Sequence, residues 1–282
     1  MTDISRLCMR PADWDGTVPA SFYVEAKIDG VRALAIHDKR PRMLTRGGME
    51  IAGTKDLTDA LAPVVERLGE PCVFDGELVA GTSFEETNAN VRAGRLDVAV
   101  YHVFDFLPAR EWRRGGFDMP YDTRRRVLEQ AWADATGQSS NAAILNRGAA
   151  VHLLNRAGPF DDVADADKLF EFARERGGEG IVIKDAAAPY LNGKSAGWIR
   201  RKVRETIDLP VVGTLCAGGK PGLVCFFDGK NVEIFAGVPS GDVDCPVAEI
   251  AHLGITSNGM LRSPSFVRWR ADKAAQQQGG IQ

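Results

Sequence analysis

The sequence predicts an α+β protein in which a larger domain of strands and flanking helices precedes a small β-barrel. As far as Lys202, stretches with strand alternation are mixed with stretches of helical periodicity. Beyond Leu209, short strand-like runs separated by glycine, proline and Asp-Gly turns take their place. The chain has 282 residues, 44% hydrophobic and 26% charged, and is long enough for two such domains.

The first predicted strands flank a short polar turn. Residues 22–28 and 31–37 are predicted to be paired strands, because apolar residues alternate in both and Asp29-Gly30 between them is typical of a hairpin. Residues 43–45 are predicted to form a third strand.

The clearest helical pattern covers residues 55–68. Thr54 is a candidate N-cap, apolar residues recur at helical spacing, and Gly69 follows as a stop signal. The same criteria predict strands at 72–74, 78–80, 98–106 and 180–184, and helices at 122–135 and 165–176.

The change of pattern after Lys202 predicts two domains, residues 1–206 and 207–282. Strand-like runs at 211–212, 223–227 and 232–238 support the prediction of a barrel in the second domain. The segment from about residue 274 is rich in Ala, Gln and Gly and is predicted to be a flexible tail.

Composition narrows the function classes. A net charge of -3 argues against a globally basic nucleic-acid binder but allows a local basic groove. The five cysteines are scattered without a C-x-x-C pair, so we expect neither a zinc site nor a disulfide framework. The sequence shows no signal peptide and no run of 18 apolar residues, and we expect a cytoplasmic protein.

The run E-A-K-I-D-G-V-R, residues 25–32, is the most informative part of the sequence. Lys27 ends a predicted strand and faces a turn containing Gly30, so its amine is displayed rather than buried. Positively charged neighbours would favour the neutral amine, the form that attacks phosphorus or carbonyl carbon. Lys27 could also be a solvated residue beside an ordinary hairpin turn, because two more Asp-Gly pairs occur in the chain.

Further charged and aromatic residues occur at predicted strand ends. Glu77 follows Asp75-Gly76, and Phe104 lies in an apolar run. Arg200 and Lys202 share a face if their segment is extended.

The run E-G-I-V-I-K opens with Glu179 and closes with Lys184. Because strand side chains alternate, Glu179 is expected on the face of Ile181 and Ile183, and Lys184 on the opposite face.

In this order, the runs resemble the covalent nucleotidyltransferase superfamily, and most closely the small, phage-type ATP-dependent DNA ligases. The resemblance extends from Glu25 to Lys273. The runs that carry it are K-I-D-G-V-R, T-R-G-G, F-D-G-E-L-V, V-F-D-F-L, E-G-I-V-I-K-D, W-I-R-R-K and, near the C-terminus, R-A-D-K. It implies an ATP-grasp-like nucleotidyltransferase domain of antiparallel sheets with flanking helices, followed by an OB-fold barrel.

The resemblance also implies roles for individual residues. Lys27 would be the catalytic nucleophile that becomes adenylated, Phe104 would stack on adenine, and Glu25 would help to distinguish adenine from guanine. The implied ATP-binding residues are Glu25, Arg32, Arg46, Glu77, Phe104, Lys184, Arg200, Lys202, Arg270 and Lys273, and the implied metal-binding residues are Asp29, Glu77 and Glu179.

The implied reaction uses ATP and Mg2+, or Mn2+, and seals a nick in double-stranded DNA in three steps. AMP passes from ATP to lysine, then to the 5′-phosphate, and is finally displaced by the 3′-hydroxyl. Arg270 and Lys273 would close over the triphosphate by a hinge at residues 205–209 and then move away. The resemblance implies a monomer.

Two features depart from the family pattern. Arg200 stands where the phosphate-binding run usually has a lysine. Only about 25 residues precede the lysine run, so we expect no N-terminal helical DNA-binding domain. The arginines of 92–95 or 110–126 would then help to hold DNA, with a salt-dependent affinity.

The sequence is also compatible with other functions. An RNA ligase or an mRNA guanylyltransferase uses a related lysine motif, although Glu25 and the C-terminal run favour a DNA ligase. The NAD-dependent ligases are disfavoured, because the chain has neither their extra N-terminal domain nor their zinc cysteines. A catalytically silent OB-type nucleic-acid binder is the alternative outside the enzymes.

Overall fold

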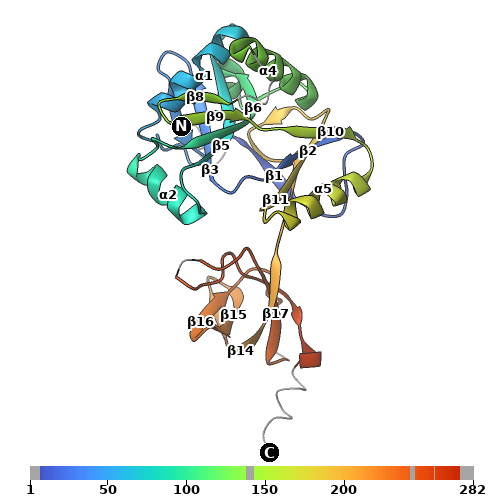
Figure 1. Ribbon diagram of the computed structural model, residues 1–282. Coiled ribbons are helices and arrows are strands. Elements are labelled where there is room, and N and C mark those ends of the chain that lie inside the picture. Colours follow the sequence, from blue (N-terminus) through green and yellow to red (C-terminus); the bar gives the residue numbers. More distant parts are fainter. Residues whose placement is uncertain (1–6, 138–142, 242–244, 257, 274–282) are drawn as a thin grey trace, which may run out of the picture. The chain divides into compact units, whose positions relative to one another are not determined.

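The computed structural model describes residues 7–137, 143–241, 245–256 and 258–273 (Figure 1). The contacts divide the chain into two compact units, residues 1–202 and 203–282. The tail predicted from residue 274 lies outside the described residues.

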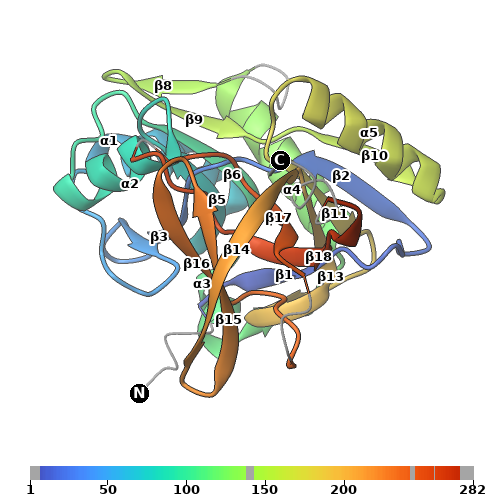
Figure 2. The same cartoon turned by 90° about the horizontal axis from the view of Figure 1, so that it is seen from below.

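A five-stranded sheet forms one half of the first unit. Its strand order is β1 (Met9–Asp13), β13 (Gly193–Lys202), β11 (Gly180–Asp185), β2 (Phe22–Ala26) and β10 (Arg156–Phe160). The pairs are antiparallel except β1 with β13, which lie side by side in Figure 2. Helix α5 (Val163–Glu175) packs on this sheet, and the apolar face of β2 and β11 forms the core beneath it.

A six-stranded sheet forms the other half. Its order is β4 (Arg42–Thr45), β3 (Val31–His37), β5 (Cys72–Val79), β6 (Val100–Pro108), β9 (Ala149–Leu153) and β8 (Ile144–Asn146). Helices α1 (Lys55–Leu68) and α4 (Tyr121–Thr136) pack together and cover one face (Figure 1). The largest apolar core lies between these helices and the sheet.

The predicted pairing of the strands around Asp29-Gly30 is wrong. Strand β2 belongs to the five-stranded sheet and β3 to the six-stranded sheet, so the chain crosses from one sheet to the other. Gly30 has no left-handed backbone conformation, but a Cβ atom there would lie 2.6 Å from the Leu78 carbonyl oxygen. The glycine therefore allows a close approach to β5 rather than a tight hairpin turn.

Helix α1 has the predicted bounds and Thr54 occupies its N-cap position, but the expected side-chain capping bond is not formed. Gly69 ends the helix with φ of 75°, and its N–H donates to the Val65 carbonyl at 3.0 Å. The Thr54 side chain makes no capping hydrogen bond and instead donates to the Ile51 carbonyl at 3.4 Å.

Strand β5 is continuous where the sequence predicted two short strands. A bulge between Asp75 and Gly76 shifts its register against β6 without ending it. A Cβ atom at Gly76 would lie 2.5 Å from the His102 carbonyl oxygen, so glycine marks this close contact rather than a turn.

Two short helices, α2 (Phe84–Ala93) and α3 (Ala109–Arg114), were not predicted. The start of α2 has a sequence signal, because Ser83 and Glu86 have the spacing of a capping box. The Ser83 hydroxyl accepts from the Glu86 N–H at 3.1 Å. The two-residue strands β7 (Gly116–Phe117) and β12 (Tyr190–Leu191) complete the unit as a small ribbon.

The second unit is an antiparallel sheet of five strands. The order is β16 (Lys230–Ile234), β15 (Lys220–Phe227), β14 (Glu205–Ala217), β17 (Val247–His252) and β18 (Ser265–Trp269), and one isolated bridge joins Ala236 to Ser265. Its core contains Leu209, Leu223, Val232 and Ile250. Residues 205–209, predicted as a hinge, form the beginning of β14 and pair with β17.

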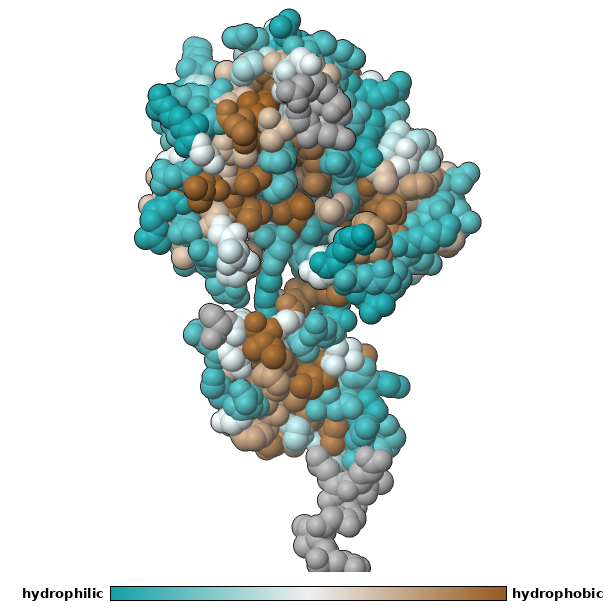
Figure 3. Space-filling model, viewed as in Figure 1, coloured by the Kyte–Doolittle hydropathy of each residue, from teal (hydrophilic) through white to brown (hydrophobic). Residues whose placement is uncertain are grey.

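On the face of the first unit that is visible in Figure 3, apolar residues gather in the middle and polar residues surround them. No described helix combines the length and the apolar character needed to cross a membrane.

Candidate active site

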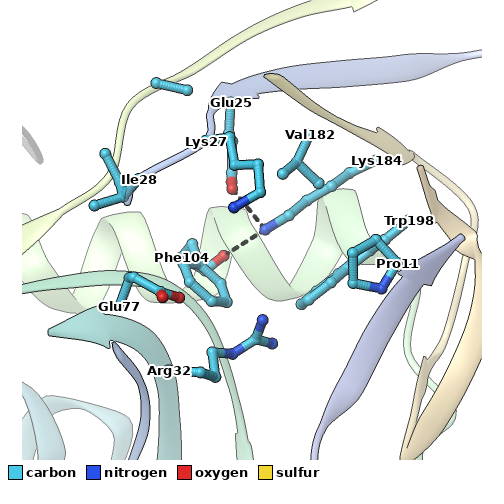
Figure 4. Close-up of a pocket in the computed structure, with 11 residues that line it drawn as sticks. Pro11, Glu25, Lys27, Ile28, Arg32, Glu77, Phe104, Val182, Lys184 and Trp198 are labelled. Atoms are coloured by element: carbon cyan, nitrogen blue, oxygen red, sulfur yellow. Dashed lines mark hydrogen bonds and ion pairs between the residues drawn. The ribbon is translucent and has the colours of Figure 1, made fainter. Parts of the chain in front are cut away.

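A pocket in the first unit lies between residues of the two sheets (Figure 4). Strands β1, β2, β11 and β13 contribute from one sheet, and β3, β5 and β6 from the other. The lining residues are Pro11, Glu25, Ala26, Lys27, Ile28, Arg32, Glu77, Phe104, Val182, Lys184 and Trp198. The crossing from β2 to β3 therefore brings Lys27 and Arg32 to one site.

Lys27 forms an ion pair at this pocket. Its Nζ donates to Glu179 Oε2 at 2.6 Å, and Lys202 Nζ lies 3.4 Å from Glu179 Oε1. Burial lowers the pKa of Lys202, the Glu179 carboxylate opposes that shift, and the neighbouring Lys27 adds to it. One carboxylate thus holds two lysines, and the side chains of Lys27 and Lys202 remain 20% and 22% exposed.

Glu179 does not share the face of Ile181 and Ile183, as strand alternation predicted. The two isoleucines are buried in the core beneath α5, whereas Glu179 contacts Lys27 and Lys202. Gly180, between them, has φ of 136°, which is outside the strand region and breaks the alternation.

Glu25 and Lys184 form a second ion pair, fully buried beside the first. Their charged atoms are 2.7 Å apart, and their side chains are 2% and 1% exposed. Tyr121 donates its hydroxyl proton to Glu25 at 2.6 Å, and Lys184 also donates to the Phe104 carbonyl at 3.1 Å. Burial lowers the pKa of Lys184 to about 8, although Glu25 opposes the shift.

Aromatic side chains and a guanidinium form another wall. The rings of Phe104 and Trp198 meet edge to face with centroids 5.8 Å apart, and the Arg32 guanidinium carbon lies 4.5 Å from the Phe104 centroid. Arg32 is held by both oxygens of the buried Asp75, at 2.5 and 2.6 Å. This bidentate pair fixes the guanidinium in the pocket wall.

Glu77 faces the same pocket from β5. Burial raises the pKa of its carboxyl to about 7, against the opposing effect of Arg32 and Lys27. A carboxyl of this kind becomes ionised when a cation approaches it.

The three predicted metal-binding residues do not form a closed cluster. Among the described residues, no group of three or more acidic, histidine or cysteine side chains is arranged to hold a metal ion. Mg2+ commonly takes only one or two carboxylates together with phosphate oxygens and water, so Glu77 and Glu179 still suit an ion that arrives with a nucleotide.

Other predicted residues lie outside the pocket lining. In the first unit these are Asp29, Arg46, Glu179, Arg200 and Lys202. Glu179 and Lys202 are connected to the pocket through Lys27, whereas Arg200 Nε donates to Asp13 on the neighbouring β1 at 2.7 Å. Arg270 belongs to the second unit, where it donates to Asp208 at 2.7 Å and to Asp272. Lys273, also in that unit, donates its backbone N–H to the Arg270 carbonyl.

Two of the arginines considered for DNA binding are not available for it. Arg124 and Arg125 are buried, and Arg124 forms a fully buried ion pair with Asp105 at 2.9 Å. The exposed arginines of this region are Arg110, Arg113, Arg114 and Arg126.

Four further residues line or support the pocket although none of them was among the predicted site residues. Pro11 lines the pocket because β1 pairs in parallel with β13. This pairing joins distant segments of the chain, and no local sequence pattern predicts it. Tyr121 supports Glu25 from the start of α4. Trp198 and Val182 had a signal, since both lie inside the runs that carry the family resemblance.

The two sheets and the pocket between them give the chain the fold of a nucleotidyltransferase ligase domain. A solved structure named Pmar-Lig_PreS3 matches with a TM-score of 0.75 at 20% identity, over 93% of this chain and 67% of that one. A structure from an analysis of Lig E DNA ligases matches with a TM-score of 0.65 at 20% identity, over 93% of this chain and 98% of that one. The ATP-dependent DNA ligase of bacteriophage T7 in complex with ATP matches with a TM-score of 0.57 at 17% identity, over 95% of this chain and 99% of that one.

The family model described as ATP dependent DNA ligase domain matches residues 15–202, and the chain belongs to this family. A DNA ligase of Halobacterium salinarum is 30% identical over 221 residues, which cover 70% of this chain and 35% of the relative. A probable DNA ligase of Streptomyces avermitilis is 27% identical over 266 residues, which cover 89% and 46%. The chain spans less than half the length of either relative.

Proposed function

We propose that the protein is an ATP-dependent DNA ligase that seals 5′-phosphate/3′-hydroxyl nicks through a lysyl-AMP intermediate. The observation that carries the proposal is the position of the Lys27 amine, at a pocket that also presents Glu25, Phe104 and Lys184. Membership of the ATP-dependent DNA ligase family supports the choice of nucleotide and substrate.

In the first step, the Lys27 nitrogen attacks the α-phosphorus of ATP. A nitrogen–phosphorus bond forms, the bond to the bridging oxygen breaks, and pyrophosphate leaves. The ammonium must first lose a proton, and the Glu179 carboxylate, 2.6 Å away, is placed to hold it. Lys202, on the same carboxylate, is placed to stabilise negative charge on the phosphates.

The nucleoside would occupy the inner part of the pocket. Phe104 and Val182 offer apolar surfaces for adenine, and the Glu25–Lys184 pair offers an acceptor and a donor for its edge. Glu77 and Arg32 would contact the ribose or the phosphates, and Arg46 and Arg200 would add phosphate contacts.

A divalent cation would supply neutralisation of the triphosphate charge during this step. Glu77 and Glu179 are the residues that would hold Mg2+ or Mn2+ together with phosphate oxygens, and Asp29 would support them through water.

The second unit would complete the enzyme as an OB-fold barrel. Its five antiparallel strands and the bridge between Ala236 and Ser265, which joins segments at its two edges, support this assignment. Residues 1–206 would then be the adenylation domain and residues 207–282 the OB domain, with Arg270 and Lys273 acting on the triphosphate by domain closure.

The remaining steps act on nicked duplex DNA. AMP moves from Lys27 to the 5′-phosphate, and the 3′-hydroxyl then displaces AMP to form the phosphodiester bond. The enzyme would work as a monomer and hold the duplex through phosphate contacts.

Sealing of a labelled nick tests the proposal directly. Purified protein with ATP and Mg2+ should join a nicked DNA duplex, and the Lys27→Ala variant should not. Joining of nicked RNA in place of DNA would identify an RNA ligase. Failure to join either, in folded protein, would contradict the proposed activity.

A further inference from the structure

Two histidines lie side by side on the sheet face that carries the pocket. His102 on β6 and His152 on β9 are direct partners in the parallel pairing of these strands, and Glu77 on β5 is the direct partner of His102. Their neighbours along each strand are buried in the core beneath α1 and α4. Because side chains alternate, both imidazoles project from the opposite face, with Glu77 and Phe104.

Neither imidazole has a hydrogen-bond partner among the residues that the structure describes. Some side-chain nitrogens of the described residues are both buried and without a hydrogen-bond partner, but those of His102 and His152 are not among them. Their ring nitrogens are therefore accessible to solvent. The nucleotide site described above uses neither side chain. Both imidazoles therefore have nitrogens that are available to a ligand.

The spacing of the rings suits one metal ion. The ring centroids are 5.6 Å apart and the planes are inclined by 36°. With a zinc–nitrogen distance of about 2.0–2.1 Å and tetrahedral angles, two imidazoles on one ion have centres about 5 Å apart. Small changes in the side-chain torsions therefore bring both rings to a common ion, without movement of the backbone.

We propose that His102 and His152 form a cross-strand binding site for a divalent transition metal, with Zn2+ as the preferred probe. Neutral imidazole is a common ligand of Zn2+, Co2+ and Ni2+, whereas Mg2+ prefers oxygen. The two histidines supply two positions, and water supplies the others.

This site is distinct from the magnesium site proposed for ATP, because its ligands are nitrogens on β6 and β9. Metal binding at the two histidines does not depend on the ligase activity. It would nevertheless affect nucleotide binding, since a metal ion on His102 would place a divalent charge beside Glu77 in the nucleotide pocket.

Calorimetric titration with Zn2+ alone, without nucleotide or DNA, tests the proposal. The protein should carry no affinity tag and should contain Cys216→Ser, because Cys216 is an exposed thiol. We expect one zinc ion per chain and an affinity reduced about tenfold or more by His102→Asn or His152→Asn. His252→Asn, at a histidine of the second unit, is the control and should leave the zinc affinity unchanged.

A second measurement avoids any effect of substitution on folding. In nitrogen-15 spectra of the histidine rings, zinc should shift the signals of His102 and His152 and leave those of His37 and His252 in place. Three results would overturn the proposal: no zinc binding, binding that survives both substitutions, or binding without a change in these two signals.

Discussion

Lys27 and Lys184 both pair with a glutamate, but their surroundings suit them to different tasks. The Lys184–Glu25 pair is almost completely buried, and removal of either partner would leave an uncompensated charge in the interior. The Lys27–Glu179 pair remains partly open, with side chains 20% and 10% exposed. Lys27 can therefore reach a substrate, whereas Lys184 is held in the pocket wall.

Glu179→Gln should slow self-adenylation by about 10²–10⁴-fold, because the amide cannot hold the proton of Lys27. Single-turnover formation of the AMP adduct measures the rate. Glu175→Gln, an exposed site at the end of α5, is the control and should keep the rate of the unmodified protein. An unchanged rate in the Glu179 variant would exclude the proposed role.

The raised pKa of Glu77, about 7 against an ordinary 4.5, predicts a pH dependence of stability. Between these values the folded state binds more protons than the unfolded state, so the free energy of unfolding falls as pH rises from about 4.5 to 7. Glu77→Gln should remove this fall and be more stable than the unmodified protein at pH 8 by about 1–3 kcal/mol.

Urea denaturation at pH 5 and pH 8 measures the difference. A Glu77→Gln variant that follows the same pH dependence as the unmodified protein would show that Glu77 does not titrate in this window.

At the scale of elements, the crossing between the sheets creates the site. Residues 27–30 leave β2 and enter β3 of the other sheet, and Gly30 permits contact with β5. Sequence periodicity predicted both strands, although β2 ends at Ala26, two residues before its predicted end. It could not predict their partners, because a hairpin and a crossing share the same local pattern and differ only in contacts with distant strands.

Gly30→Ala should destabilise the protein by about 1–3 kcal/mol, because the new methyl group would lie 2.6 Å from the backbone oxygen of Leu78. Gly47→Ala is the control, since its nearest atom is 3.9 Å away. Equal unfolding midpoints for the two variants would contradict this account of Gly30.

The candidate site was more predictable than the topology around it. Lys27, Glu25, Glu77, Phe104 and Lys184 lie in short runs whose residue types and spacing carry the chemistry, and all five line the pocket. Pro11 and Tyr121 could not be predicted, because they reach the site only through the pairing of β1 with β13 and the packing of α4. The direction of the Glu179 side chain depends on the backbone conformation of Gly180, which cannot be predicted from the alternation of side chains along a strand.

At the scale of the whole molecule, the second unit should contribute differently to self-adenylation and to the sealing of DNA. Arg270 is held in the second unit by Asp208 and Asp272, and these pairs raise its pKa further above the usual range. If the second unit acts on the triphosphate, Arg270→Ala should slow self-adenylation and leave sealing by pre-adenylated protein nearly unchanged.

Arg268→Ala, two residues earlier on β18 and 66% exposed, is the control for this experiment. The opposite pattern, in which the Arg270 variant forms the adduct normally and fails to seal DNA, would refute the proposed role of the second unit in the first step.

The most direct test of the central claim is the intact mass of the protein after incubation with ATP and Mg2+. We predict a gain of one AMP in the unmodified protein and in the control Lys168→Ala, no gain in Lys27→Ala, and no adduct with GTP or NAD+. An adduct that persists in Lys27→Ala, or folded protein that is free of AMP at the start and gains none, would contradict the account.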